Sequence, residues 1–195
     1  MCDPQVLSDR SYLWYFLASI FAFTVYLMPN LHMPSLMASM KIPPAEVSMA
    51  VSILGIATGC GRLMCGAATN FSHHVVKINL IVNVCCAGAT FLYPHCTKAS
   101  HFYVVTAING LCLGPLITLA PVTMVHLLGV DLLGTAYGLW QMMYGILLLA
   151  GPPFIGALID YCQEYTVPFY VAAVFFLLAA FFQALCEWRT SNRYT

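Results

Sequence analysis

Charged side chains are scarce in this sequence. Only 7% of its 195 residues are charged, 61% are hydrophobic, and the mean hydropathy is +0.84. A soluble domain carries about a quarter charged residues, because its surface must face water. The seven basic and seven acidic side chains cannot coat a soluble globule, and their net charge of zero gives no reason to expect a nucleic-acid partner. The composition therefore predicts an integral membrane protein.

The motifs of soluble enzymes and metal sites are also missing. The sequence contains no G-x-S-x-G, no H-E-x-x-H, no P-loop and no G-x-G-x-x-G. None of its nine cysteines forms a C-x-x-C pair with histidines at ligand spacing. Most of the cysteines lie in apolar runs, where cysteine behaves as a small hydrophobic residue. We therefore expect neither an enzyme nor a metal site, and no cofactor.

Long apolar segments are what the sequence has instead. Six of them can each cross a hydrocarbon core of about 30 Å at 1.5 Å per residue: 11–31, 45–68, 75–93, 102–128, 133–161 and 168–188. All six are predicted to be helices, because an open set of strands cannot satisfy its backbone in lipid. We expect an all-α membrane protein with a six-helix bundle at 11–189, an N-terminal segment at 1–10 and a tail at 190–195.

Basic residues near the helix ends predict the orientation of the bundle. Four lie on one side and two on the other: Arg10, Lys77, Arg189 and Arg193 against Lys41 and Lys98. Cytoplasmic loops carry the excess of lysine and arginine. The bias therefore places both termini in the cytoplasm, and an even number of spans requires them to share one side.

Arg62 is the one charged residue that sits well inside a predicted span. An ionisable residue at that depth is costly and marks a functional site by default. Steps of three and four place Gly55, Thr58, Gly59 and Arg62 in one stripe of small residues, which faces other helices or a cavity. A guanidinium there offers a planar, two-pronged grip suited to a carboxylate. The alternatives stay open: Arg62 snorkels to an interface roughly two turns away, or pairs with an acid elsewhere.

Small residues and prolines inside the spans bear on packing. Glycines four residues apart occur in three spans, at Gly55 and Gly59, Gly110 and Gly114, and Gly134 and Gly138. Such pairs let helices approach closely in lipid, and we interpret them as packing positions. Gly151-Pro152-Pro153 predicts a broken helix, because proline removes a backbone donor. Broken helices in membranes are tolerated where they are buried in protein or line a cavity.

Several stretches resemble the monocarboxylate transporters of the major facilitator superfamily. YLMPNLHMPSLMA (26–38) and IPPAEVSMAVSILGIATGCGRLMCG (42–66) are similar to their seventh and eighth helices. NGLCLGPLITLAPVTMVHLLGVDLLGTAYGL (109–139) resembles the tenth helix and the start of the eleventh, which GPPFIGALIDYCQEYTVPFY (151–170) continues. The resemblance implies the second six-helix half of a twelve-helix carrier, with the solute held between the halves and carried by alternating access.

The resemblance also implies roles for particular residues. Arg62 coincides with the eighth-helix arginine that anchors the substrate carboxylate in proton-coupled members. Those members carry an aspartate one turn earlier, where this chain has Thr58, and the change puts proton coupling in doubt. Leu113 stands where an aromatic residue is often found. Independently of the resemblance, six polar positions inside the spans line a path or bond neighbouring helices: Asn30, Asn79, Asn83, Asn109, Gln141 and Tyr144. Asn109, Gln141 and Tyr144 join Arg62, Thr58 and Leu113 as the predicted substrate-binding residues.

The function implied is transport of a small organic monocarboxylate across the plasma membrane. The expected partners are the organic anion, the lipid bilayer, and a missing N-terminal half or a second copy that supplies the other wall. An ancillary membrane glycoprotein that assists delivery is left open. The alternatives are a carrier of a neutral or zwitterionic solute, such as an aromatic amino acid, and a remnant that binds a partner and transports nothing.

Overall fold

The computed structural model describes residues 6, 8–71, 75–162 and 164–194, and these residues are almost entirely helical. The elements in chain order are α2 (Arg10–Thr24), α3 (Met28–Ser39), α4 (Pro44–Phe71), α5 (Val75–Leu92), the 3-10 turn η1 (Tyr93–His95), α6 (Ala99–Leu128), α7 (Leu133–Cys162) and α8 (Thr166–Tyr194). They form six membrane-length apolar spans, the first made of α2 and α3 together. The prediction of an all-α, six-span bundle is confirmed.

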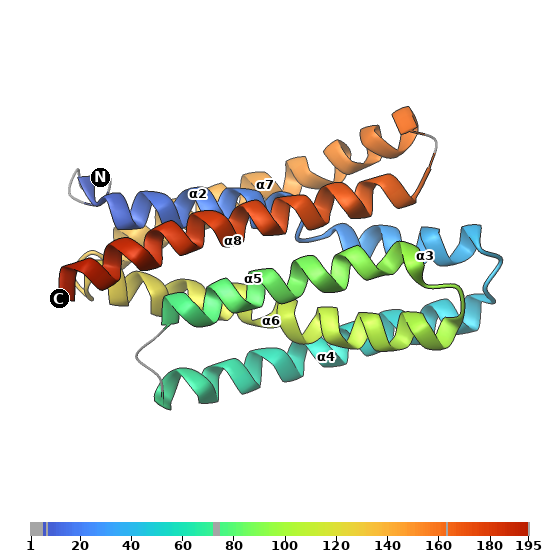
Figure 1. The fold of residues 1–195 in the computed structure, drawn as a ribbon, viewed down its shortest axis with the longest axis horizontal. Helices are drawn as coiled ribbons and strands as arrows, with labels where there is room; N and C mark the ends of the chain where they lie inside the picture. Colours follow the sequence, from blue (N-terminus) through green and yellow to red (C-terminus); the bar gives the residue numbers. More distant parts are fainter. Residues whose placement is uncertain (1–5, 7, 72–74, 163, 195) are drawn as a thin grey trace.

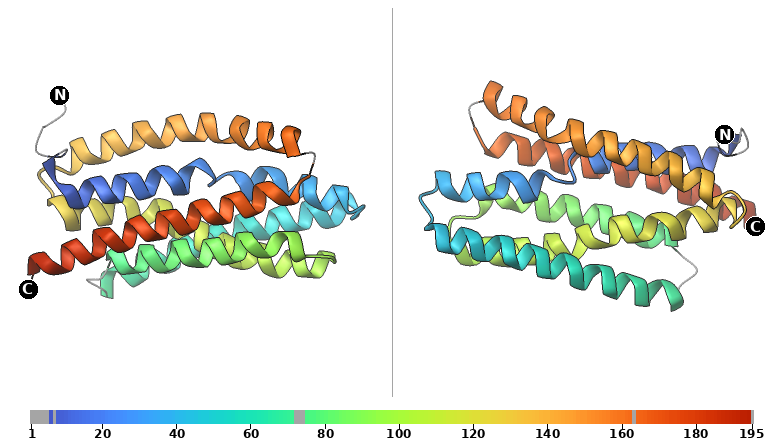
Figure 2. Two further views of the ribbon diagram at one scale, coloured as in Figure 1. Left: turned by 45° about the horizontal axis from the view of Figure 1, so that its top comes forward. Right: turned by 180° about the vertical axis from the view of Figure 1, so that it is seen from behind.

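The helices run roughly parallel to one another in two groups (Figure 1). The views place α2, α7 and α8 along one side of the bundle and α4, α5 and α6 along the other (Figure 2). The start of α2 and the end of α8 lie at the same end. The most extensive contacts join α4 to α6, α5 to α8 and α2 to α8. The helix α8 reaches Tyr194, through residues expected to form a tail.

Glycine lets α4 and α6 approach closely. A Cβ atom at Gly110 would lie 2.8 Å from the carbonyl oxygen of Leu54, and one at Gly114 would lie 2.9 Å from the backbone nitrogen of Arg62. The packing prediction is therefore confirmed for this pair. Gly134 and Gly138 pack against no helix of this chain, because an added Cβ at either would meet no described atom within 4 Å.

The broken helix lies in a different span from the predicted one. The helix α7 continues through Pro152 and Pro153, so the predicted break there is wrong. Proline costs helical hydrogen bonds, but its fixed φ is compatible with a helix. The first span breaks instead, between Thr24 and Met28, and Pro29 stands in the first turn of α3, a position that proline favours. Gly151 sits against this break, since a Cβ there would lie 2.5 Å from the carbonyl oxygen of Thr24.

Candidate functional site

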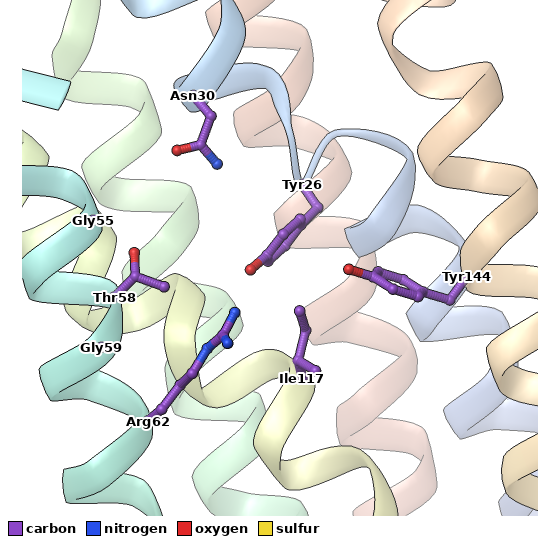
Figure 3. A pocket seen from close by; sticks show the side chains of 8 residues that line it. All are labelled: Tyr26, Asn30, Gly55, Thr58, Gly59, Arg62, Ile117 and Tyr144. Carbon is purple, nitrogen blue, oxygen red and sulfur yellow. The ribbon is translucent and has the colours of Figure 1, made fainter. Parts of the chain in front are cut away.

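An open cavity of about 400 Å³ lies between α4, α6, α7 and the break between α2 and α3. Its lining comes from the break itself and from α3, α4, α6 and α7: Tyr26, Asn30, Gly55, Thr58, Gly59, Arg62, Ile117 and Tyr144. Figure 3 shows these side chains around one space. Three of the six predicted substrate-binding residues, Thr58, Arg62 and Tyr144, therefore lie in one cavity.

Arg62 supplies the charge of this cavity. Its side chain leaves α4 and points toward the hydroxyl of Tyr26 (Figure 3). The guanidinium is close enough to interact with the hydroxyls of Tyr26 and Tyr144. Among the described residues that line the cavity there is no aspartate or glutamate. A guanidinium carries five N–H donors, so Arg62 keeps donors that no carboxylate of this lining accepts.

The α4 wall beside Arg62 is nearly flat. Gly55 and Gly59 present no side chain, and an added Cβ at either would meet no described atom within 4 Å. These two glycines therefore line the cavity, and the interpretation that they pack helices is wrong. The hydroxyl of Thr58 donates to the carbonyl oxygen of Leu54 at 2.7 Å. Its proton is thus engaged within the helix, and its oxygen keeps accepting capacity toward the cavity.

Aromatic packing holds the opposite wall in place. Tyr144 stacks on Trp140, with ring centroids 5.4 Å apart and planes 8° apart, and Phe23 meets Tyr144 edge-on at 4.9 Å. Trp140 is fully buried, and Tyr26 is 5% exposed at the break of the first span. The two tyrosine hydroxyls are therefore carried on rings whose positions the core determines.

The other three predicted residues lie outside the cavity lining. Asn109 is fully buried between α5 and α6, where its Nδ2 donates to Thr90 Oγ1 at 3.1 Å. Leu113 is 1% exposed in the hydrophobic core, and Gln141 is exposed on α7. For Asn109 the structure favours the helix-bonding alternative, because its amide is committed to another helix.

Five lining residues were absent from the predicted set: Tyr26, Asn30 and Ile117, together with Gly55 and Gly59 of the small-residue stripe. Asn30 and Tyr26 reach the cavity because the chain changes direction between α2 and α3. Pro29 was the available signal, since a proline that starts a helix also marks the end of the preceding one. Ile117 carries no signal of this kind, because an apolar residue in an apolar span is unremarkable.

Comparison with known proteins places this chain in a family. The model of the Major Facilitator Superfamily matches residues 13–192, nearly the whole chain. The chain belongs to this superfamily. The match agrees with the six membrane-length helices, and it shows a multi-pass membrane protein of a transporter superfamily.

The similar curated proteins are named as transporters. Monocarboxylate transporter 14 of Mus musculus is 26% identical over 180 residues, which is 91% of this chain and 35% of that protein. Monocarboxylate transporter 7 of Homo sapiens is 26% identical over 95% of this chain and 36% of its own length, and monocarboxylate transporter 9 of Gallus gallus is 28% identical over 78% and 30%. The resemblance to monocarboxylate transporters is confirmed. The chain spans about a third of the length of these relatives.

Proposed function

We propose that this chain is the second half of a carrier that moves a small organic monocarboxylate across the plasma membrane by alternating access. One observation carries the proposal: the guanidinium of Arg62, inside a membrane span, lines an open cavity whose described lining has no acid to pair with it. An arginine at such depth needs a partner. A carboxylate that enters with the solute supplies one.

The cavity supports a particular binding mode. Two parallel hydrogen bonds from the guanidinium fit the two oxygens of a carboxylate. The hydroxyls of Tyr26 and Tyr144 lie beside Arg62 and add donors on the same side, and Asn30 offers an amide farther along the cavity (Figure 3). Ile117 and the tyrosine rings supply apolar surface for the rest of the solute. We propose Arg62, Thr58, Tyr144, Tyr26 and Asn30 as the substrate-binding residues.

The cavity has a wall on one side only. The spans of α4 and α7, which flank it, are 22% and 17% buried, whereas the other four spans are 44–56% buried. The exposed faces of these two helices are suited to pack against a second six-helix unit that completes the site. That unit is an N-terminal half or a second copy of this chain. In the proposed orientation the ends of the bundle that carry Arg10 and Arg189 face the cytoplasm.

Transport by reconstituted chain tests the proposal. Purified chain would be placed in lipid vesicles, cross-linked to report its oligomeric state, and assayed for uptake of labelled lactate, pyruvate and an aromatic amino acid. We expect no saturable uptake by the monomer, because one wall cannot close a site from both sides. Saturable uptake is expected from dimers, or after a matching first half is added.

Two results would overturn parts of this account. Saturable uptake by a demonstrated monomer contradicts the two-wall arrangement. Uptake of the amino acid without uptake of either carboxylate contradicts the monocarboxylate assignment and supports the zwitterionic alternative.

A further inference from the structure

A second polar cluster lies apart from the Arg62 cavity, where α2, α5 and α8 pack together. It consists of five side chains that we name the amide cluster: Tyr15, Ser19, Asn79, Asn83 and Gln183. Each of them is at most 5% exposed. They surround a small cavity of about 10 Å³, closed elsewhere by Ala18, Ala22, Phe23 and Leu116.

Two amide atoms in this cluster lack partners. Asn83 Nδ2 donates to the carbonyl oxygen of Asn79 at 3.0 Å and to Asn79 Oδ1 at 3.3 Å. Within the described part of the chain, Asn83 Oδ1 accepts no hydrogen bond and Gln183 Nε2 donates none. Both residues are 2% exposed and line the same small cavity. An unpaired buried polar group costs about 1–3 kcal/mol.

The two unpaired atoms are complementary, one an acceptor and the other a donor. We infer that one water molecule binds in this cavity and bridges Asn83 Oδ1 to Gln183 Nε2. A volume of about 10 Å³ is close to the smallest that holds a water, and a buried water makes about three hydrogen bonds. Ser19 can provide the third, because its Oγ donates to the carbonyl oxygen of Tyr15 at 2.9 Å and still accepts.

Water fits this site whichever way the Gln183 amide is turned. If the nitrogen faces the cavity, the water accepts from it and donates to Asn83. If the amide is flipped and the oxygen faces the cavity, the water donates to both amide oxygens and has no hydrogen left for Ser19 Oγ. A ligand that only donates would satisfy the flipped arrangement alone, and a ligand that only accepts would satisfy neither.

A cation is a poor fit for the same cavity. The side chains that line it are all neutral, with no aspartate, glutamate or histidine among the described residues of the lining. A buried ion without an opposite charge costs several kcal/mol. The site therefore takes a neutral molecule of the size of water, which links α2, α5 and α8 through hydrogen bonds that lipid cannot supply.

Radiolytic labelling tests for this water directly. X-ray radiolysis turns water into hydroxyl radicals where it stands, so side chains beside an internal water are oxidised even when bulk solvent cannot reach them. Tyr15 lines the cavity at 1% exposure. Tyr12 and Tyr93 are 0% exposed, and their hydroxyls donate to the Ala136 carbonyl oxygen and to Thr106 Oγ1. In the purified chain we expect Tyr15 to be oxidised at least about fivefold faster than Tyr12 or Tyr93.

Substitutions of Asn83 and Gln183 test whether the labelling of Tyr15 depends on their amide atoms. Gln183→Met and Asn83→Leu keep similar volumes and remove one bridging partner each, so labelling of Tyr15 should fall to the level of Tyr12. Gln141→Met makes the same chemical change on the exposed face of α7 and should leave Tyr15 labelling unchanged.

Three results would overturn the inference. The first is Tyr15 labelling no faster than Tyr12 in the parent chain, a comparison that decides even if the variants fail to fold. The second is unchanged Tyr15 labelling in both folded variants. The third is a melting temperature that rises with sodium or potassium but not with choline, which would assign the cavity to a cation.

Discussion

The Arg62 cavity and the amide cluster are two polar sites that differ in size, in access and in charge. The first is about 400 Å³, open, and charged; the second is about 10 Å³, closed, and neutral. The first is flanked by α4 and α7, the two least buried spans, and the second lies among α2, α5 and α8, whose spans are at least 44% buried. The charge thus lies where a solute can neutralise it, and the neutral amides lie where helices pack.

The helices that pack on several sides and the helices that flank the cavity therefore carry different kinds of polar side chain. Helices that pack on several sides use neutral polar groups, which hydrogen-bond at modest cost. The helices α4 and α7, which flank the cavity, keep one face exposed, and there the proposed solute and second half would bind. If the two regions are independent, a substitution in one leaves the properties of the other unchanged.

The largest effect is expected beside the Arg62 cavity, at the crossing of α4 and α6. A Cβ at Gly114 would press on the backbone of Thr58 and Arg62, so Gly114→Ala should cost about 1–3 kcal/mol of stability and weaken carboxylate binding. Gly138→Ala is the matched control, because it meets no described atom within 4 Å. Thermal unfolding in detergent would measure both. Equal melting temperatures for the two variants would show that the crossing tolerates the extra atom.

Removing a tyrosine hydroxyl from the cavity should have a smaller effect that is confined to binding. Tyr26→Phe and Tyr144→Phe each lose a donor beside Arg62, which is worth about 0.5–1.5 kcal/mol, or about two- to tenfold in affinity. Equilibrium binding of labelled pyruvate would measure the change. Tyr12 does not line this cavity, so Tyr12→Phe serves as the control for loss of a buried hydroxyl. Affinity that falls only in Tyr12→Phe would move the site elsewhere.

Thr58→Asp should introduce pH dependence with a modest loss of affinity at neutral pH. An ionised carboxylate one turn before Arg62 competes with the solute for the guanidinium, at a cost of up to about 1 kcal/mol, or roughly fivefold. Protonation of the introduced carboxylate removes that competitor, so pyruvate affinity should recover as the pH falls toward the titration range of the carboxyl group. The parent chain, with threonine, should bind with weak pH dependence. Steep acid stimulation of the parent would show that another group carries a proton.

The smallest effect is expected at Gln141, which was predicted as a site residue and lies exposed outside the cavity lining. Gln141→Ala should change stability by less than about 0.5 kcal/mol and leave pyruvate affinity unchanged. A clear loss of pyruvate affinity, with an unchanged melting temperature, would show that Gln141 contacts the solute although it lies outside the cavity lining.

Hydropathy and charge predicted the membrane spans and the position of Arg62, because both follow from how well a side chain is solvated by lipid. The six spans follow from segment length, and Arg62 stands out because a charge in hydrocarbon needs a reason. Thr58 followed from helical spacing, since it lies one turn from Arg62. These features depend on local sequence, and the structure places Thr58 and Arg62 in one cavity.

Packing decided the parts that sequence could not predict. Asn30 and Asn109 are the same amide in similar apolar surroundings, yet one lines the cavity and the other bonds Thr90. The difference depends on which neighbour each helix face meets. The contact of Gly151 with the carbonyl oxygen of Thr24, 127 positions earlier in the chain, likewise pairs two residues that no local pattern connects.

The grip of Arg62 on a carboxylate is the centre of this account, and binding to the chain in lipid nanodiscs tests it most directly. Labelled pyruvate would be titrated against the parent, Arg62→Lys and the control Arg10→Lys. The three proteins would first be shown to have equal melting temperatures. Lysine keeps the charge and loses the two-pronged geometry, so Arg62→Lys should bind about ten- to a hundredfold more weakly, while Arg10→Lys binds like the parent. Equal pyruvate affinity of Arg62→Lys and the parent would contradict the account.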